Sequence, residues 1–160
     1  MSRYCTLSNY AANKFPLYNT YVNFDEYPNE IIPNLFLGNT THRNPRILNT
    51  LGITNIVTVN EEDAIPGYNN LVMKMKDIPS QRLFPTLFLV YNFINYHLSK
   101  GEKVLVHCTA GISRSASAVT YFVMKRYGMG FEDAYKLVKE KRPIVSINPG
   151  FESQLKSLKL

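Results

Sequence analysis

Short apolar runs alternate along this chain with longer stretches in which apolar positions recur every three or four residues. Runs of the first kind are typical of buried strands, and stretches of the second kind are typical of helices that cover a sheet. Strands are predicted at 53–59, 71–75 and 103–107, and a strand, a turn and a second strand are predicted within 30–38. Helices are predicted at 44–51, 83–98, 115–127, 131–141 and 149–158.

Strands separated by helices predict an α/β fold, with a compact, mostly parallel central sheet and helices on both of its faces. The pattern begins at Pro28, where the composition changes. Residues 1–27 are rich in Tyr and Asn and have no clear period. We expect them to form an N-terminal arm that is flexible, that lies on the domain as a strap, or that mediates dimerisation. Residues 28–160 are then the one folded domain, and the oligomeric state is left open.

Composition narrows the class of protein. The 160 residues hold 18 Lys and Arg against 12 Asp and Glu, and the resulting charge of +6 suits an anionic partner. No apolar run approaches the ~20 residues of a membrane-spanning helix and no secretory leader is visible, so we expect a cytoplasmic or nuclear protein. The two cysteines and three histidines are scattered, which predicts neither a disulfide framework nor a metal site.

The segment 104–115, VLVHCTAGISRS, carries the candidate chemistry. It is predicted to be a buried strand, a loop of small residues and the start of a helix, an arrangement whose amides and helix dipole bind anions. Gly111 allows a close backbone approach, and Arg114 adds a planar guanidinium fork. Cys108 lies at the centre, where a helix N-terminus and a cation favour the thiolate. A thiolate beside a bound phosphoryl group indicates covalent phosphoryl transfer.

Each of these residues also has an ordinary explanation. A cysteine at the end of a strand is commonly a small core residue, and an arginine at a helix start is commonly a surface charge. The combination is harder to explain in that way, because Cys108 and Arg114 stand six residues apart between a strand and a helix with only small or neutral residues between them.

The stretch HCTAGISRS at 107–115 resembles the H-C-x-x-G-x-x-R-S signature of the cysteine-dependent protein tyrosine phosphatases, in particular the dual-specificity phosphatases. Segments 32–38, 51–57 and 142–155 are similar to three further motifs of that family, in the family's order. The resemblance covers residues 28–158. It implies a metal-independent enzyme without a cofactor that hydrolyses phosphotyrosine and phosphoserine or phosphothreonine in proteins. No tyrosine-rich recognition motif precedes the signature, so we expect a shallow site open to both kinds of substrate.

The resemblance also implies roles for the residues of the signature. Cys108 would be the nucleophile that forms a cysteinyl-phosphate, and Arg114 would bind two phosphate oxygens and stabilise the transition state. His107 would orient the loop and favour the thiolate, and Ser115 would donate a hydrogen bond to the departing thiolate. Backbone N–H groups of the loop would bind the phosphate, and they belong to Thr109, Ala110, Gly111, Ile112, Ser113 and Arg114.

Two residues outside the signature match the family's remaining functional positions. Asp77, in MKMKDIP, stands 31 residues before Cys108 and matches the aspartate that protonates the leaving group. Its ordinary explanation is a turn before Pro79. Asn148 matches an asparagine of the C-terminal motif that helps to fix the phosphate-binding loop.

Two other functions fit parts of the pattern. Some relatives have lost the cysteine and only bind phosphoproteins, whereas Cys108, Arg114 and Asp77 are all present here. Other relatives act on phosphorylated lipids or on RNA 5′ ends and carry basic residues at the site, whereas the variable positions of this loop are neutral. A phosphorylated protein is therefore the expected substrate, and no nucleic acid partner is expected.

Three residues outside these motifs suggest further contacts. Arg43 and Arg46 fit a role in binding acidic residues of a substrate, although a solvated helix face is the commoner role. Cys5 fits a resolving thiol for an oxidised Cys108 only where the arm folds across the site.

Overall fold

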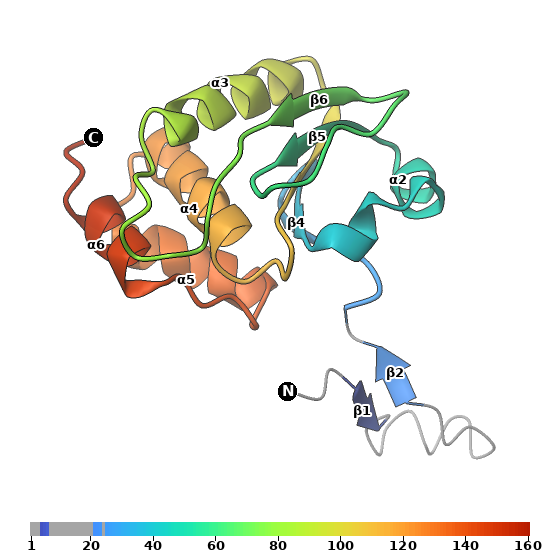
Figure 1. Cartoon of the computed structure of the whole chain (residues 1–160), viewed down its shortest axis with the longest axis horizontal. Coiled ribbons are helices and arrows are strands. Elements are labelled where there is room, and N and C mark those ends of the chain that lie inside the picture. Colours follow the sequence, from blue (N-terminus) through green and yellow to red (C-terminus); the bar gives the residue numbers. More distant parts are fainter. Residues whose placement is uncertain (1–3, 7–20, 24) are drawn as a thin grey trace.

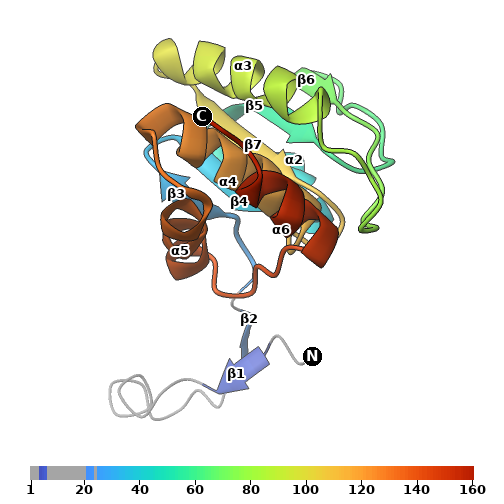
Figure 2. The same cartoon turned by 90° about the vertical axis from the view of Figure 1, so that its left-hand side faces the viewer.

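The computed structural model describes residues 4–6, 21–23 and 25–160. Five strands form one sheet in the order β3-β4-β7-β5-β6 (Figures 1 and 2). All neighbours are parallel except β3, which runs antiparallel to β4 at one edge, so the predicted mostly parallel sheet is confirmed. The strands are β3 (Asn29–Ile32), β4 (Leu35–Gly38), β5 (Ile53–Thr58), β6 (Asn69–Val72) and β7 (Lys103–His107). A separate antiparallel pair joins β1 (Tyr4–Thr6) to β2 (Tyr21–Asn23).

Helices cover both faces of the five-stranded sheet, as predicted. The helix α2 packs against one face, α3 to α5 pack against the other, and α6 lies on α4 (Figures 1 and 2). The longest helices of residues 25–160 have 14 residues, and none has the apolar length that a bilayer crossing requires. The helices are η1 (Thr40–Arg43, a 3-10 helix), α2 (Pro45–Leu51), α3 (Thr86–Ser99), α4 (Arg114–Tyr127), α5 (Phe131–Lys141) and α6 (Pro149–Lys156).

The central strand β7 shows why the sheet needs cover on both faces. Successive side chains of a strand point to opposite sides. Val104 and Val106 enter the larger core beneath α3 to α6, whereas Leu105 enters the smaller core beneath α2. All three are fully buried. The continuous apolar run of β7 therefore places the end of this strand, and the loop that follows it, in the middle of the molecule.

Local signals define the ends of several elements. Pro33 and Asn34 form the turn between β3 and β4, and Asn34 adopts the positive φ of 71° that such turns place at their second central residue. The helix α2 begins after Asn44, whose side chain accepts a hydrogen bond from the amide of Arg46. It ends at Gly52 in the left-handed conformation, with φ of 75°.

Some predicted boundaries differ from the observed ones. The helix predicted from residue 83 begins at Thr86, because a residue before proline disfavours the helical conformation and Phe84 precedes Pro85. The strand predicted at 71–75 lies at 69–72, and the helix predicted to residue 158 ends at Lys156. The short helix η1 has too few residues to show a period and was not predicted.

Candidate active site

The signature loop, residues 108–113, joins the central strand β7 to the N-terminus of α4. His107, the last residue of β7, is in register with Gly38 of β4 and Thr58 of β5. The loop thus leaves the carboxyl ends of three parallel strands, where open α/β sheets bind their ligands. Ser113 at the N-cap makes no side-chain cap, which leaves the first amides of α4 for a ligand.

The carbonyl groups of the signature loop accept hydrogen bonds from the structure that surrounds it. These bonds come from the start of η1, from the residue after α5 and from the segment before α6. The donor–acceptor pairs are Thr40 N to Thr109 O (3.2 Å), Arg142 Nη2 to Ala110 O (3.5 Å), Arg142 Nε to Gly111 O (2.8 Å) and Ser146 N to Ile112 O (2.9 Å). Four successive carbonyl groups are thereby occupied.

The amide groups of the loop consequently face the other way. A trans peptide places each N–H opposite the carbonyl before it, so an occupied carbonyl fixes the direction of the next amide. The amides so directed belong to Ala110, Gly111, Ile112 and Ser113, and none of them donates to another described residue. Together they form a ready site for an oxyanion.

Gly111 is required by the close packing of this loop. Its φ is 67°, which residues with a side chain rarely adopt. A Cβ atom there would also lie 2.6 Å from the carbonyl oxygen of Gly38 and 2.6 Å from Arg142 Nη2. The loop can therefore approach β4 and Arg142 only with glycine at this position.

Cys108 and Ser115 lie side by side at the base of the loop. Cys108 is only 2% exposed, and its Sγ lies 3.1 Å from the Oγ of Ser115, which is fully buried in the first turn of α4. The hydroxyl of Ser115 can donate to a thiolate across this distance. The thiol thus has a hydrogen-bond donor on one side and the amides of the loop around it.

Arg114 connects the signature loop to the segment that carries Asp77. Its Nη1 donates to the carbonyl oxygen of Met75 at 3.1 Å. Its Nε is buried and has no hydrogen-bond partner among the described residues. A buried donor without a partner is rare in proteins, and a phosphate oxygen is the acceptor that a guanidinium group fits best.

The Asp77 loop, residues 73–85, is held in place by α6. A Cβ atom on Gly150 would lie 2.0 Å from the carbonyl oxygen of Pro79, so the helix approaches the loop more closely than any other residue would allow. Gln154 bonds the loop backbone twice, at 2.9 and 3.0 Å. The exposed carboxylate of Asp77 accepts a hydrogen bond of 2.8 Å from Asn148 Nδ2. The C-terminal motif therefore positions the candidate general acid.

Asn148 contacts the signature loop through its backbone. Its backbone N–H, and not its side chain, donates to Ser113 Oγ at 3.0 Å. The side chain instead bonds Asp77 and accepts from the amide of Phe151 at 2.9 Å, which caps α6. Asn148 thus joins the signature loop, the Asp77 loop and α6.

Comparison with known proteins identifies this arrangement. A profile described as the dual specificity phosphatase catalytic domain matches residues 35–159. The chain belongs to the dual specificity phosphatase family. The family predicted from the sequence is therefore confirmed.

Individual members of the dual specificity phosphatase family agree with this assignment. The chain is 39% identical over 134 residues to dual specificity protein phosphatase 12 of Rattus norvegicus, covering 79% of this chain but 40% of the rat protein. It is 36% identical over 130 residues to dual specificity protein phosphatase 1B of Arabidopsis thaliana, covering 79% and 78%. The crystal structure of DUSP15 superposes with a TM-score of 0.77 at 32% identity, covering 81% and 85%. The phosphatase-like fold is confirmed.

His107 in this dual specificity phosphatase domain is a neutral, buried histidine. Burial lowers the pKa of its imidazole to about 4. Its Nδ1 lies 3.2 Å from the carbonyl oxygen of Cys108, which requires a proton on Nδ1, and its Nε2 accepts from Thr58 Oγ1 at 2.8 Å. The ring therefore orients the Cys108 peptide through a hydrogen bond and brings no positive charge to the thiol at neutral pH.

The buried His107 predicts a fall in stability with acidification. An unfolded histidine binds a proton near pH 6.5, whereas folded His107 does so only near pH 4, so the unfolded state gains protons first as the pH falls. The contribution of neutral His107 to the free energy of unfolding is fully present above pH 6.5. About 3 kcal/mol of it is lost by pH 4. Urea unfolding of the intact chain and of His107→Asn across this range measures it. The histidine chain is expected to lose more stability than the variant, and parallel curves would contradict the assignment.

Arg142 is a site residue that sequence reasoning passed over. It is 1% exposed and donates hydrogen bonds to the carbonyls of Ala110 and Gly111. In the sequence it is one of several basic residues at the end of α5. Its membership of the matched segment 142–155 is the signal that could have identified it.

The expectations for Arg43, Arg46 and Cys5 have different outcomes. Arg43 is 15% exposed and bonds Glu62 and the carbonyl of Asp63, so it does not form a solvated helix face. Although burial opposes it, hydrogen bonds from Thr40, Arg43 and Asn60 hold the pKa of Glu62 below its ordinary value. Arg46 is exposed. The side chain of Cys5 lies outside the described part of the chain.

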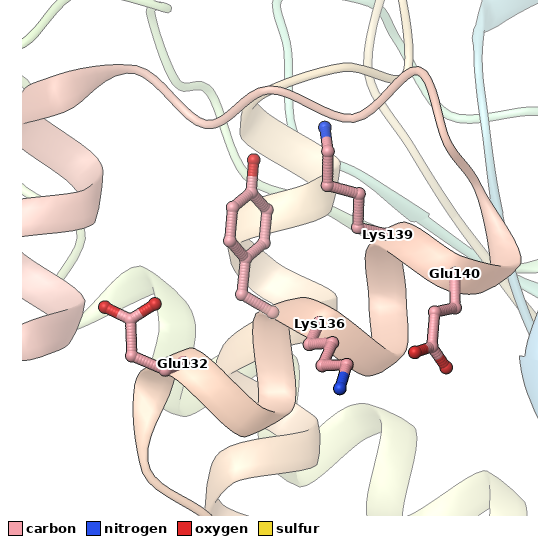
Figure 3. Close-up of a pocket in the computed structure, with 5 residues that line it drawn as sticks. Glu132, Lys136, Lys139 and Glu140 are labelled. Carbon is pink, nitrogen blue, oxygen red and sulfur yellow. The ribbon is translucent and has the colours of Figure 1, made fainter.

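A hollow on the surface is lined by residues of α5 and by none of the signature loop. It has a volume of about 410 Å³ and lies along α5 (Figure 3). Three of its charged residues, Glu132, Lys136 and Glu140, follow one another four residues apart with alternating sign, which is typical of a solvated helix face. Tyr135 and Lys139 complete the lining, and Lys139 donates to the carbonyl oxygen of Val145 at 2.7 Å.

Proposed function

We propose that this chain is a metal-independent protein phosphatase that hydrolyses phosphotyrosine and phosphoserine or phosphothreonine through a cysteinyl-phosphate. The chain spans 40% of the length of its rat relative, so the proposal concerns the domain described here. One observation carries it. Four amides of the loop that begins at Cys108, and Nε of Arg114 directly after that loop, have no partner among the described residues, so an oxyanion bound to them meets the thiol.

The first step transfers the phosphoryl group to the enzyme. The thiolate of Cys108 attacks phosphorus, and the bond between phosphorus and the leaving oxygen breaks. The loop amides and Arg114 bind the three peripheral oxygens, whose charge they stabilise in the transition state. Asp77, held by Asn148, donates its proton to the leaving oxygen and becomes a carboxylate.

The second step returns the enzyme to its starting state. The carboxylate of Asp77 accepts a proton from a water molecule, and the water oxygen attacks phosphorus. The bond between sulfur and phosphorus breaks, and inorganic phosphate leaves. The hydroxyl of Ser115, 3.1 Å from Sγ, donates to the departing thiolate.

The substrate and the compartment follow from the same chemistry. Phosphoproteins are the typical substrates of the family. The neutral loop lacks the lysines that would favour a multiply phosphorylated headgroup. A free thiol nucleophile requires reducing conditions, so we place the enzyme in the cytoplasm or the nucleus.

Phosphate release from matched phosphotyrosine and phosphothreonine peptides, with a chelator present, tests this function. Release from both peptides is expected, at rates that the chelator does not change. No release from either peptide by the folded, reduced protein would overturn the proposal in favour of a binding adaptor or a substrate that is not a protein.

A further inference from the structure

Asp25 is buried, although it lies in the stretch 1–27 that was predicted to be an arm. It is 8% exposed. Its two carboxylate oxygens accept hydrogen bonds from the Arg142 guanidinium, Oδ1 from Nη1 at 2.7 Å and Oδ2 from Nη2 at 3.2 Å. Asn39 Nδ2 donates to Oδ2 at 2.7 Å, and His42 Nε2 lies 2.7 Å from the backbone carbonyl. Asp25 therefore packs into the folded domain.

The same guanidinium group reaches the signature loop. Arg142 Nε donates to Gly111 O at 2.8 Å, and Nη2 lies 3.5 Å from Ala110 O. A guanidinium is planar and rigid, so fixing one edge of it on a carboxylate fixes the direction of its other N–H groups. Arg142 is almost fully buried, and a buried cation depends strongly on its counter-charge.

A second connection runs from Asp25 to the start of the loop. Asn39, held by Asp25, accepts from the amide of Thr41 through Oδ1 at 2.9 Å. This contact caps η1, whose first residue, Thr40, donates its amide to Thr109 O at 3.2 Å. The groups that donate to the carbonyls of Thr109, Ala110 and Gly111 are thus all held, directly or through Asn39, by the Asp25 carboxylate.

We propose that Asp25 is a positioning residue for phosphate binding. It fixes Arg142 and Asn39 so that the carbonyls of the loop turn outward and the amides turn toward the phosphate. The proposal rests on the proposed function, because it assigns Asp25 to the same loop. It differs from a purely structural ion pair, since loss of the Asp25 charge changes the direction of the amides that stabilise the Cys108 thiolate and bind phosphate.

The test compares Asp25→Asn and Asp25→Ala with Glu26→Gln in the full chain. Glu26 is the exposed neighbour of Asp25, and its replacement removes the same charge. The readouts are the pH dependence of Cys108 alkylation by iodoacetamide and the protection of Cys108 by inorganic phosphate. Thermal unfolding shows that each variant is folded. None of these readouts requires turnover, so an inactive but phosphate-binding protein would overturn the proposed function alone.

We expect Asp25→Asn to need a higher pH for alkylation and to bind phosphate about tenfold more weakly, with a larger effect in Asp25→Ala. Glu26→Gln is expected to match the unchanged chain. Folded Asp25 variants with unchanged alkylation and phosphate protection would overturn the proposal. Loss of folding in both variants would also count against it, because Asp25 would then serve the fold as a whole.

Discussion

Replacement of Cys108 by serine is expected to abolish phosphate release while phosphopeptide binding remains. Serine is nearly the same size, so the loop amides and Arg114 keep their positions. A hydroxyl is hardly ionised at neutral pH, so the attacking anion is lost. The measurement is phosphate release from a phosphotyrosine peptide, together with peptide binding by calorimetry.

The other cysteine of the chain provides the matched control for Cys108→Ser. Cys5→Ser makes the same chemical change in the N-terminal segment and is expected to leave turnover unchanged. Turnover that survives in Cys108→Ser would show that another residue, or water acting directly, attacks the phosphorus.

Replacement of Asp77 by asparagine is expected to slow hydrolysis according to the leaving group. Phosphoserine and phosphothreonine release an alkoxide, which leaves poorly without a proton, so the rate should fall by about 100-fold to 10,000-fold. A nitrophenyl phosphate releases a stable anion and should lose much less. Asparagine can still meet Asn148 Nδ2 through its oxygen, so the position of the loop is kept.

Asp63→Asn is the matched control for Asp77→Asn. The Asp63 side chain is fully exposed, and its replacement by asparagine removes the same charge. It is expected to leave both rates unchanged. Equal losses on the two substrates in Asp77→Asn would place the proton donor elsewhere.

The residues that form the anion site lie close together in the sequence, but the residues that hold the signature loop in place do not. Cys108, Gly111 and Arg114 lie within one strand, loop and helix start, so residue types and spacing suffice to predict the anion site. Arg142 and Asp25 stand 117 residues apart, and neither lies in a pattern that links it to the other. Their contact depends on how β4, η1 and the end of α5 pack together.

Two other features of the structure were also not predicted correctly from the sequence pattern. The beginning of α3 was predicted three residues early, because the apolar spacing continues through residues 83 and 84 although Pro85 prevents helix before it. The side-chain contact from Asn148 to Asp77 spans 71 residues and follows from the close packing of Gly150 on Pro79. A backbone approach of this kind leaves no periodic trace in the sequence.

Detection of a phosphoryl group on Cys108 tests the central claim most directly. Ser115→Ala removes the hydroxyl that lies 3.1 Å from Sγ, so it should slow the departure of the thiolate and let the intermediate accumulate. The variant is mixed with a phosphotyrosine peptide, quenched within its first turnover, digested and mapped by mass spectrometry. The account predicts a phosphoryl group on the peptide that contains Cys108. Phosphate release without a phosphoryl group on Cys108 at any time would contradict it.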